Sequence, residues 1–227
     1  MLGKRVLVCA AALSCLLAMA FTTPMDMEGK AMEEFSLPAF FSNGMMFQQK
    51  KPMNLWGKAP SGRTVEARLV REPTGQTVET AAVKAGAAGD WALRFSPVHG
   101  GYDAYRIEVT CGAESKTIRD IVAGELWLAT GQSNMEFMLA NSVGGDDLIV
   151  NADDPYIRIL LEPIEPVYGS KYPAEPAYDI AGARWGYGNN GGDIRYCSAV
   201  AYLAVKKMRE KLDVPVGFIN AARGATS

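Results

Sequence analysis

The sequence predicts an α/β protein in which a small all-β sandwich domain precedes a domain built on a parallel sheet. Two observations lead to this prediction. Between residues 37 and 120, several short segments alternate apolar and polar residues, which is the period of a half-buried strand, and turn-forming residues separate them. After residue 120, an apolar strand, a helix and a second apolar strand follow one another, which is typical of a parallel sheet with right-handed crossovers.

The expected first domain, residues 37–120, contains three clear alternating runs. They cover residues 65–69, 91–95 and 105–109, and the turn signals between runs lie at residues 60–62, 73–75, 86–90 and 100–101. Short strands at this spacing are typical of an antiparallel sandwich. We expect Trp56 and Trp91 to fill its core, because large aromatic side chains dominate such packing; a sugar-stacking platform is the alternative.

Residues 1–20 have the features of a cleavable signal peptide. The positive pair Lys4-Arg5 precedes an apolar run over residues 6–17, and an A-x-A cleavage signal ends at Ala20. The apolar run is too short to span a membrane. We therefore expect cleavage after Ala20 and a secreted or periplasmic chain with no stable membrane insertion. Residues 21–36 are polar and methionine-rich, and we expect them to form a linker.

Charge and cysteine content narrow the functional class. The 227 residues carry a formal net charge of −2, and no basic stripe runs along the chain, which argues against nucleic acid as the main partner. Loss of the signal peptide would change the charge to −4 and remove Cys9 and Cys15; lipidation of Cys15 is the less favoured alternative. Cys111 and Cys197 would remain as separate thiols, although an oxidising compartment permits a bridge. They do not form a metal-site pattern.

The most informative stretch covers residues 125–136, Glu-Leu-Trp-Leu-Ala-Thr-Gly-Gln-Ser-Asn-Met-Glu. Its apolar run at 126–129 predicts a buried strand, and Gly131 allows an abrupt turn into a helix. Ser133 is therefore expected at the carboxyl end of a strand and near a helix N-terminus, where N–H groups can stabilise an oxyanion. The alternative is that Ser133 only caps the helix.

The rest of the chain predicts further elements of the parallel sheet. We expect a strand at residues 156–161, a surface excursion at 162–183, a turn-rich loop at 185–192 in which Trp185 packs rather than contacts sugar, and a strand at 216–219. A helix begins at its N-cap Ser198, with an apolar stripe formed by Val200, Leu203, Ala204, Met208 and Leu212. Because Ser133 and Gly224 both follow strands, we expect them to share one edge of the sheet.

Several blocks of the chain, in order, resemble the N-terminal part of sialate O-acetylesterase-like carbohydrate esterases, within the SGNH hydrolases. The blocks are residues 41–48, 55–60, 89–91, 122–136, 198–202, 214–220 and 223–226. The most specific is Gly131-Gln-Ser-Asn-Met135, which differs from the Gly-x-Ser-x-Gly motif of α/β-hydrolases. The resemblance implies that residues 121–227 are an incomplete SGNH hydrolase domain with a flavodoxin-like parallel sheet.

The resemblance also implies a serine esterase that removes acetyl groups from sugars, typically sialic acids, without a metal or an organic cofactor. Ser133 matches the nucleophile, and the N–H groups of Ser133 and Gly224 match two oxyanion-hole donors. Ala225 stands where the family usually has a second glycine. An acetylated sugar or glycan is thus the expected partner. Which sugar is deacetylated, whether sialic acid, xylan or another glycan, stays open, and the sequence makes no prediction about oligomeric state.

One part of the family's catalytic machinery has no counterpart in this sequence. In the family, a third oxyanion donor and an Asp-x-x-His that supplies the base come later in the chain, whereas the only histidine here, His99, precedes the serine and is expected to be a solvated loop side chain. Without a base, a comparable serine enzyme loses about 10⁴–10⁶-fold in turnover. We therefore expect a fragment, or the product of an interrupted gene, that is inactive as written.

Two alternatives follow from the same observation. The chain could be a non-catalytic carbohydrate-binding or interaction protein that keeps the esterase frame, or a separate chain could supply the missing half. We also expect residues 121–227 to be unstable alone, because the sheet would lack its later strands and expose strand edges.

Overall fold

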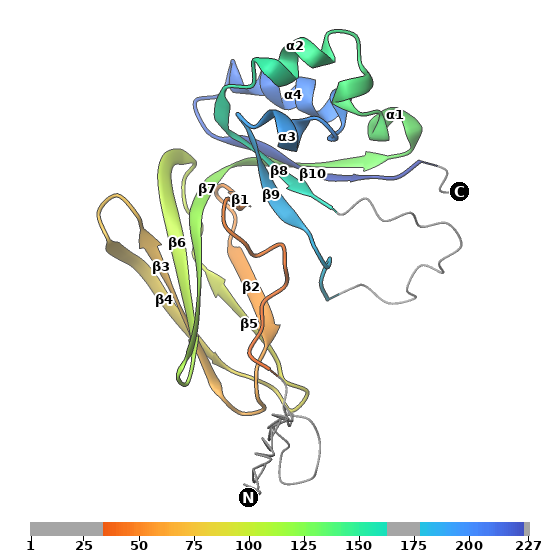
Figure 1. Cartoon of the computed structure of the whole chain (residues 1–227). Coiled ribbons are helices and arrows are strands. Elements are labelled where there is room, and N and C mark those ends of the chain that lie inside the picture. The colour runs from red at the N-terminus through yellow and green to blue at the C-terminus, as the bar shows by residue number, and fades with distance from the viewer. Residues whose placement is uncertain (1–33, 163–177, 225–227) are drawn as a thin grey trace, which may run out of the picture. The chain divides into compact units, whose positions relative to one another are not determined.

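The computed structural model describes residues 34–162 and 178–224, and strands dominate them (Figure 1). The strands are β1 (Met46–Gln48), β2 (Met53–Lys58), β3 (Thr64–Arg71), β4 (Gln76–Lys84), β5 (Asp90–Phe95), β6 (Gly101–Cys111), β7 (Glu114–Gly131), β8 (Asp154–Leu161), β9 (Arg184–Gly188) and β10 (Val216–Ala222). The helices are α1 (Ser133–Glu136), α2 (Gly145–Val150), α3 (Gly191–Ile194) and α4 (Ala199–Arg209), with a 3₁₀ turn η1 (Leu139–Asn141).

Within the described residues, eight strands form one mixed sheet. Its order is β4-β3-β6-β7-β10-β8-β9, and β1 adds to β7. The pairs β4–β3, β3–β6 and β6–β7 are antiparallel, whereas β10 pairs in parallel with both β7 and β8. The predicted parallel pairing of strands is therefore confirmed for β7, β10 and β8, but these strands belong to one mixed sheet together with the antiparallel strands.

Strand β7 is common to the antiparallel and the parallel parts of this sheet. Its first half pairs with β6, and its second half, from Glu125 to Gly131, pairs with β10. The domain boundary that the sequence predicts, between residues 120 and 121, therefore falls inside one continuous strand. Figure 1 shows β7 running from the β3–β4–β6 strands to the base of α1.

The first hydrophobic core lies mainly among the antiparallel strands β2 to β7, and Leu160 of β8 and Trp185 of β9 also belong to it. Strands β2 and β5 form a separate two-stranded sheet, and their apolar side chains share one buried cluster with those of β3 and β6. Trp91 is buried, with only 3% of its surface exposed, and Trp56 packs against the same cluster beside Phe41. Both tryptophans therefore serve the core, as predicted, rather than a sugar-stacking platform.

A second core lies between the helices and the parallel strands. It contains Leu139, Ile159, Tyr202, Val205 and Phe218, from η1, β8, α4 and β10. The predicted helix after Ser198 is confirmed, and the Ser198 side chain accepts a hydrogen bond from the Ala201 N–H as its cap.

The predicted apolar stripe of α4 is wrong for most of its residues, although Met208 packs against the second core. Its buried residues are Ala199, Ala201, Tyr202 and Val205, whereas Val200 and Leu203 are about half exposed. Tyr202 decides the orientation because its large ring fills the space above β8 and β10, and the small alanines beside it allow the helix to come close to the sheet. The period of the apolar residues predicted a helix but not which side of it packs.

The segment predicted as a turn-rich loop at residues 185–192 is also different. Strand β9 takes up its first half and pairs antiparallel with β8, and α3 begins at Gly191. Gly186 and Gly188 permit this because an added Cβ at either would collide with β8 or Asp193. Trp185 packs, as predicted: it is 7% exposed and its Nε1–H donates to the Phe40 carbonyl at 2.8 Å.

Of the other expected segments, most lie outside the described residues. This holds for the signal peptide, for most of the linker and for residues 163–177 of the predicted surface excursion. The end of the expected linker belongs to the core, since Phe35 is 1% exposed and Ser36 pairs with Lys58.

Cys111 and Cys197 are both buried and unbridged, which confirms the prediction of separate thiols. Burial raises the pKa of the Cys111 thiol, and it raises the pKa of the Cys197 thiol to about 12. Both groups therefore stay protonated and unreactive at neutral pH.

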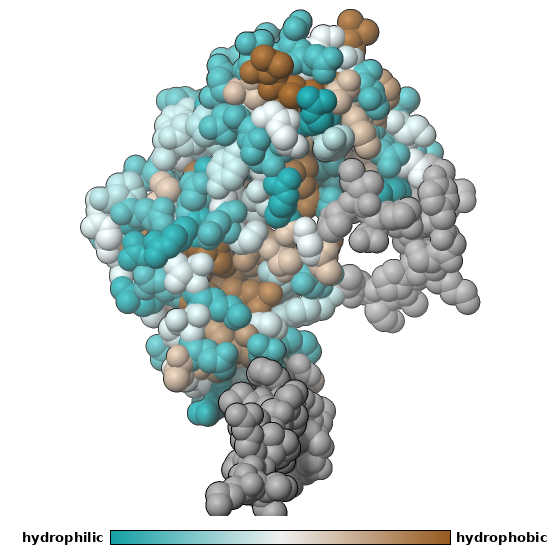
Figure 2. Space-filling view, in the orientation of Figure 1, coloured by the Kyte–Doolittle hydropathy of each residue, from teal (hydrophilic) through white to brown (hydrophobic). Residues whose placement is uncertain are grey.

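The face drawn in Figure 2 is mostly hydrophilic, with apolar groups over the helices and further apolar groups lower down, over the strands. Several large apolar side chains are exposed after residue 120, among them Trp127, Leu128, Val150 and Leu203. The strand predicted at residues 126–129 exists as the end of β7, but the prediction that it is buried is wrong, because Trp127 is 51% and Leu128 62% exposed. No helix within residues 34–162 and 178–224 has the length and apolar character that crossing a membrane requires.

Candidate active site

The parallel pairing of β7 with β10 brings the two predicted site residues to one edge of the sheet. Gly131, the last residue of β7, is in register with Ala222, the last residue of β10, and the Arg223 N–H donates to the Gly131 carbonyl at 3.0 Å. Ser133 follows β7 by two residues, and Gly224 follows β10 by two residues. The register therefore explains why the two loops meet.

Ser133 is the first residue of the short helix α1, and it is exposed. Gly131 makes the turn that precedes it, with φ of 143°, which a side chain would disfavour. The helix cap is Gln132 rather than Ser133, so the interpretation of Ser133 as a capping residue is wrong. Its hydroxyl is consequently not needed for a cap and is open to solvent.

Gly224 lies directly beside Ser133 and Glu136. A Cβ atom added to Gly224 would collide with Glu136 Oε2 and would lie 3.6 Å from Ser133 Oγ, so only glycine fits without movement. The Gly224 N–H donates to Glu136 Oε2 at 2.7 Å. The backbone donor that the sequence analysis assigns to an oxyanion hole thus points at a negatively charged oxygen beside the serine.

A small hydrogen-bonded cluster supports α1 from the side of α4. The Asn220 Oδ1 accepts from the Ser198 N–H at 3.1 Å, and the Ser198 hydroxyl contacts the Met135 sulfur at 3.3 Å. Met138 also pairs with Ser198 as an isolated bridge. Strand β10, the start of α4 and the serine loop therefore constrain one another.

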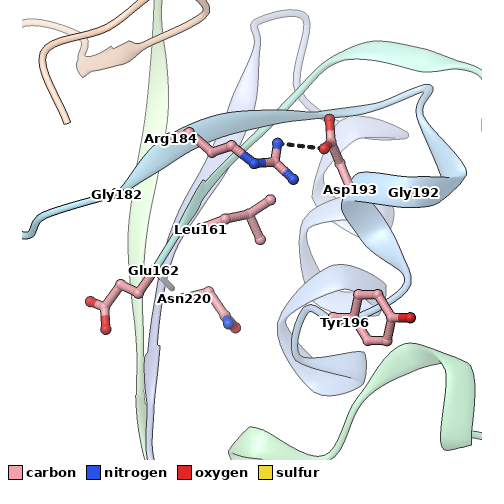
Figure 3. A pocket seen from close by; sticks show the side chains of 8 residues that line it. All are labelled: Leu161, Glu162, Gly182, Arg184, Gly192, Asp193, Tyr196 and Asn220. Carbon is pink, nitrogen blue, oxygen red and sulfur yellow. Dashed lines mark hydrogen bonds and ion pairs between the residues drawn. The ribbon is translucent and has the colours of Figure 1, made fainter. Parts of the chain in front are cut away.

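A cavity of about 240 Å³ opens at the same edge (Figure 3). It is lined by Leu161, Glu162, Gly182, Arg184, Gly192, Asp193, Tyr196 and Asn220. Arg184 Nη1 lies 2.6 Å from Asp193 Oδ1, the pair joined by a dashed line in Figure 3. Asp193 is buried, and its second carboxylate oxygen accepts from the Tyr187 N–H at 3.0 Å. Both oxygens of Asp193 are therefore hydrogen-bonded.

A second, smaller cavity of about 40 Å³ lies next to the first. Three residues, Glu162, Tyr196 and Asn220, line both, and the second cavity reaches Glu136 and Arg223. Burial raises the pKa of Glu162, and the positive charge of Arg223 partly offsets this. The two cavities together connect the Arg184–Asp193 pair with the residues around Gly224.

His99 is not part of this arrangement. It is exposed in the segment between β5 and β6 and lines a different cavity with Arg71, Tyr102 and Asp103. Among the residues that the structure describes, no group of three or more histidine, cysteine, aspartate or glutamate side chains is arranged to hold a metal ion.

Glu136, Glu162 and Tyr196 belong to this site but were not predicted from the sequence. For Glu136 a signal was present, because it follows Ser133 by three residues and shares its helical turn. Glu162 and Tyr196 carry no such signal, since only the fold brings the end of β8 and the segment before α4 to the serine edge.

No family model matches the chain. It is 25% identical over 199 residues to the sialate O-acetylesterases of Rattus norvegicus and Homo sapiens, covering 85% of this chain and 36% and 38% of theirs. The chain thus spans little more than a third of the length of these relatives.

The chain is also similar to a solved structure of a carbohydrate acetylesterase. The crystal structure of a carbohydrate acetylesterase from Xanthomonas citri matches with a TM-score of 0.75 and 26% identity, over 86% of this chain and 41% of that one. The resemblance to sialate O-acetylesterase-like esterases that the motifs indicate is therefore confirmed.

Proposed function

Starting from this similarity to sialate O-acetylesterases, we propose that the chain is the N-terminal part of a serine-dependent carbohydrate O-acetylesterase. Acetyl-ester hydrolysis on sugars agrees with what its relatives do. The observation that carries the proposal is the meeting of Ser133 with Gly224, where a Cβ on the glycine would lie 3.6 Å from the serine Oγ.

In the proposed reaction, Ser133 Oγ attacks the carbonyl carbon of the acetyl ester while a base takes the hydroxyl proton. The N–H groups of Ser133 and Gly224 donate to the carbonyl oxygen as it becomes an oxyanion. The bond between the carbonyl carbon and the sugar oxygen then breaks. The sugar oxygen takes up a proton, and the acetyl group stays on the serine as an acetyl ester. Water attacks this ester, and acetate leaves with the serine restored.

Glu136 competes with the substrate for one of the proposed oxyanion-hole donors. Its carboxylate accepts the Gly224 N–H that the oxyanion needs. The substrate carbonyl must therefore displace Glu136 Oε2 from that donor before the transition state forms.

We propose that a base for Ser133 comes from sequence beyond this chain, as in the resembling family, and that the 227 residues alone have negligible turnover. His99, the single histidine of the sequence, lines another cavity. A serine hydroxyl without a base is a weak nucleophile.

The test compares Ser133→Ala with the control Ser115→Ala, an exposed serine on β7 outside the site. If the coding sequence continues into an Asp-x-x-His, the longer protein should hydrolyse an aryl acetate, and only Ser133→Ala should abolish turnover. Equal activity of Ser133→Ala and its parent would refute the proposed nucleophile. Serine-dependent turnover by the 227 residues alone would refute their proposed inactivity.

We extend the proposal to two features outside the site. Residues 1–20 would direct export of the chain and be removed by cleavage after Ala20, and N-terminal sequencing of the secreted protein tests this. Residues 37–120 would form the small sandwich domain of the SGNH hydrolase, supported by the single core that β2 and β5 share with β3 and β6.

A further inference from the structure

We propose that the 240 Å³ cavity is the subsite for the sugar ring and that it selects a neutral O-acetylated sugar over an anionic sialic acid. The inference rests on the proposed function in one respect, because it takes Ser133 as the position of the ester. Whether the cavity binds a sugar, and of which charge, can be measured without any turnover.

The position of the cavity is the first argument. It shares Glu162, Tyr196 and Asn220 with the smaller cavity that reaches Glu136 and Arg223. Glu136 in turn contacts the Gly224 N–H beside Ser133. A ring seated in the larger cavity would therefore direct an acetyl group through the smaller one toward the serine.

Size and chemistry are the second argument. A volume of about 240 Å³ is below the roughly 300–1,000 Å³ of pockets for drug-sized ligands, which suits one sugar residue rather than an oligosaccharide. The Arg184–Asp193 pair, Glu162 and Asn220 offer donors and acceptors to hydroxyl groups. Tyr196, 54% exposed, offers a ring for the apolar face of a pyranose.

Charge is the third argument, and it decides between the two sugar classes. Among the residues that the structure describes, three carboxylates, Glu136, Glu162 and Asp193, and two cations, Arg184 and Arg223, line the two cavities. Arg184 forms an ion pair with Asp193 at 2.6 Å, and the positive charge of Arg223 is attracted by the carboxyl group of Glu162. The carboxylate of a sialic acid would therefore meet a surplus of negative charge. At contact distance in water-like surroundings, one such repulsion weakens binding about fivefold.

The experiment titrates the Ser133→Ala chain, which cannot form an acetyl-serine, with two probes followed by NMR chemical shifts. The probes are methyl 6-O-acetyl-α-D-glucopyranoside and 9-O-acetyl-N-acetylneuraminic acid. We expect the neutral sugar to bind at least about fivefold more tightly. Glu162→Gln should reduce the ratio of the two dissociation constants, whereas the control Glu66→Gln should leave this ratio unchanged, because Glu66 is exposed on β3.

A second variant tests the proposed contact between Tyr196 and the sugar ring. Tyr196→Ala should weaken binding of the neutral sugar about threefold to tenfold, while its circular dichroism spectrum stays that of the parent. Equal affinities, tighter binding of the sialic acid, or no measurable binding of the neutral sugar would each overturn the inference. Because Ser133→Ala removes turnover, these outcomes are independent of the hydrolysis assay, and the subsite and the esterase proposal can fail separately.

Discussion

Replacing Asp120 with asparagine should lower the free energy of unfolding by about 2–3 kcal/mol. The Asp120 carboxylate accepts hydrogen bonds from Arg158 Nη1 at 2.9 Å, Arg158 Nη2 at 3.0 Å and the Tyr187 hydroxyl at 2.8 Å. Asp120 lies in the middle of β7, whereas Arg158 and Tyr187 belong to β8 and β9. These hydrogen bonds therefore connect β8 and β9 with the part of β7 where its pairing changes from β6 to β10.

The magnitude follows from the burial of the two charges. The Arg158 side chain is 3% exposed, and within residues 34–162 and 178–224 its Nε has no hydrogen-bond partner. Removing the partner of a buried charge costs about 3–5 kcal/mol, but Asp120 is 42% exposed, and solvent screening reduces the cost. Asparagine also tolerates the left-handed backbone at residue 120, where φ is 54°, so backbone strain does not confuse the comparison.

Urea unfolding followed by circular dichroism measures the difference, and Asp103→Asn serves as the control. Asp103 pairs with Arg71 on the surface, with exposures of 51% and 39%, so its loss should cost no more than about 1 kcal/mol. A cost for Asp120→Asn no larger than that of Asp103→Asn would refute the reasoning.

Acid should act on the same carboxylate. Burial alone would raise the pKa of Asp120, but the hydrogen bonds from Arg158 and Tyr187 outweigh it and hold the pKa below its usual value. A carboxylate with a lowered folded pKa stabilises the protein above the unfolded pKa of about 3.9, and the contribution is lost as the pH falls through the folded pKa. Asp120→Asn should therefore cost less at pH 3 than at pH 7.

Three further predictions concern packing, reactivity and folding. Gly124→Ala should destabilise the protein by about 1–3 kcal/mol in urea, because the added Cβ would overlap the Pro215 carbonyl, whereas Gly101→Ala, with open space around it, should stay within about 1 kcal/mol of the parent. Cys197 should resist alkylation at neutral pH until denaturant is added, since it is fully buried and its thiol pKa is raised to about 12; rapid labelling of the native protein, mapped by mass spectrometry, would contradict this. Residues 121–227 alone should be unfolded, because the cut divides β7 and removes Asp120; a well-dispersed NMR spectrum would show otherwise.

Local patterns predicted a large part of this fold. Alternation predicted β3, β5 and β6, apolar runs predicted β8 and β10, and the Ser198 cap predicted the start of α4. Each of these depends on a few adjacent residues. The shared edge of Ser133 and Gly224 was also predictable, because parallel strands end together.

Features that depend on distant partners were not predictable. The packed side of α4 depends on Tyr202 meeting β8 and β10, so the period of its apolar residues was not enough. The contact of Glu136 with Gly224 joins residues 88 positions apart, and that of Arg158 with Asp120 joins residues 38 apart. No local signal in either segment indicates its partner.

The double pairing of β7 has a consequence for the order in which the protein folds. Its first half meets β6 within a hairpin that closes at residues 111–114, so this pairing can form early. Its second half must wait for β10, which lies about 90 residues further along the chain. On a translating ribosome, this interval corresponds to roughly 5–20 s. During that time Leu126, Trp127 and Leu128 lack their strand partner, and the unpaired edge of the segment that leads to Ser133 is open to pairing with other chains.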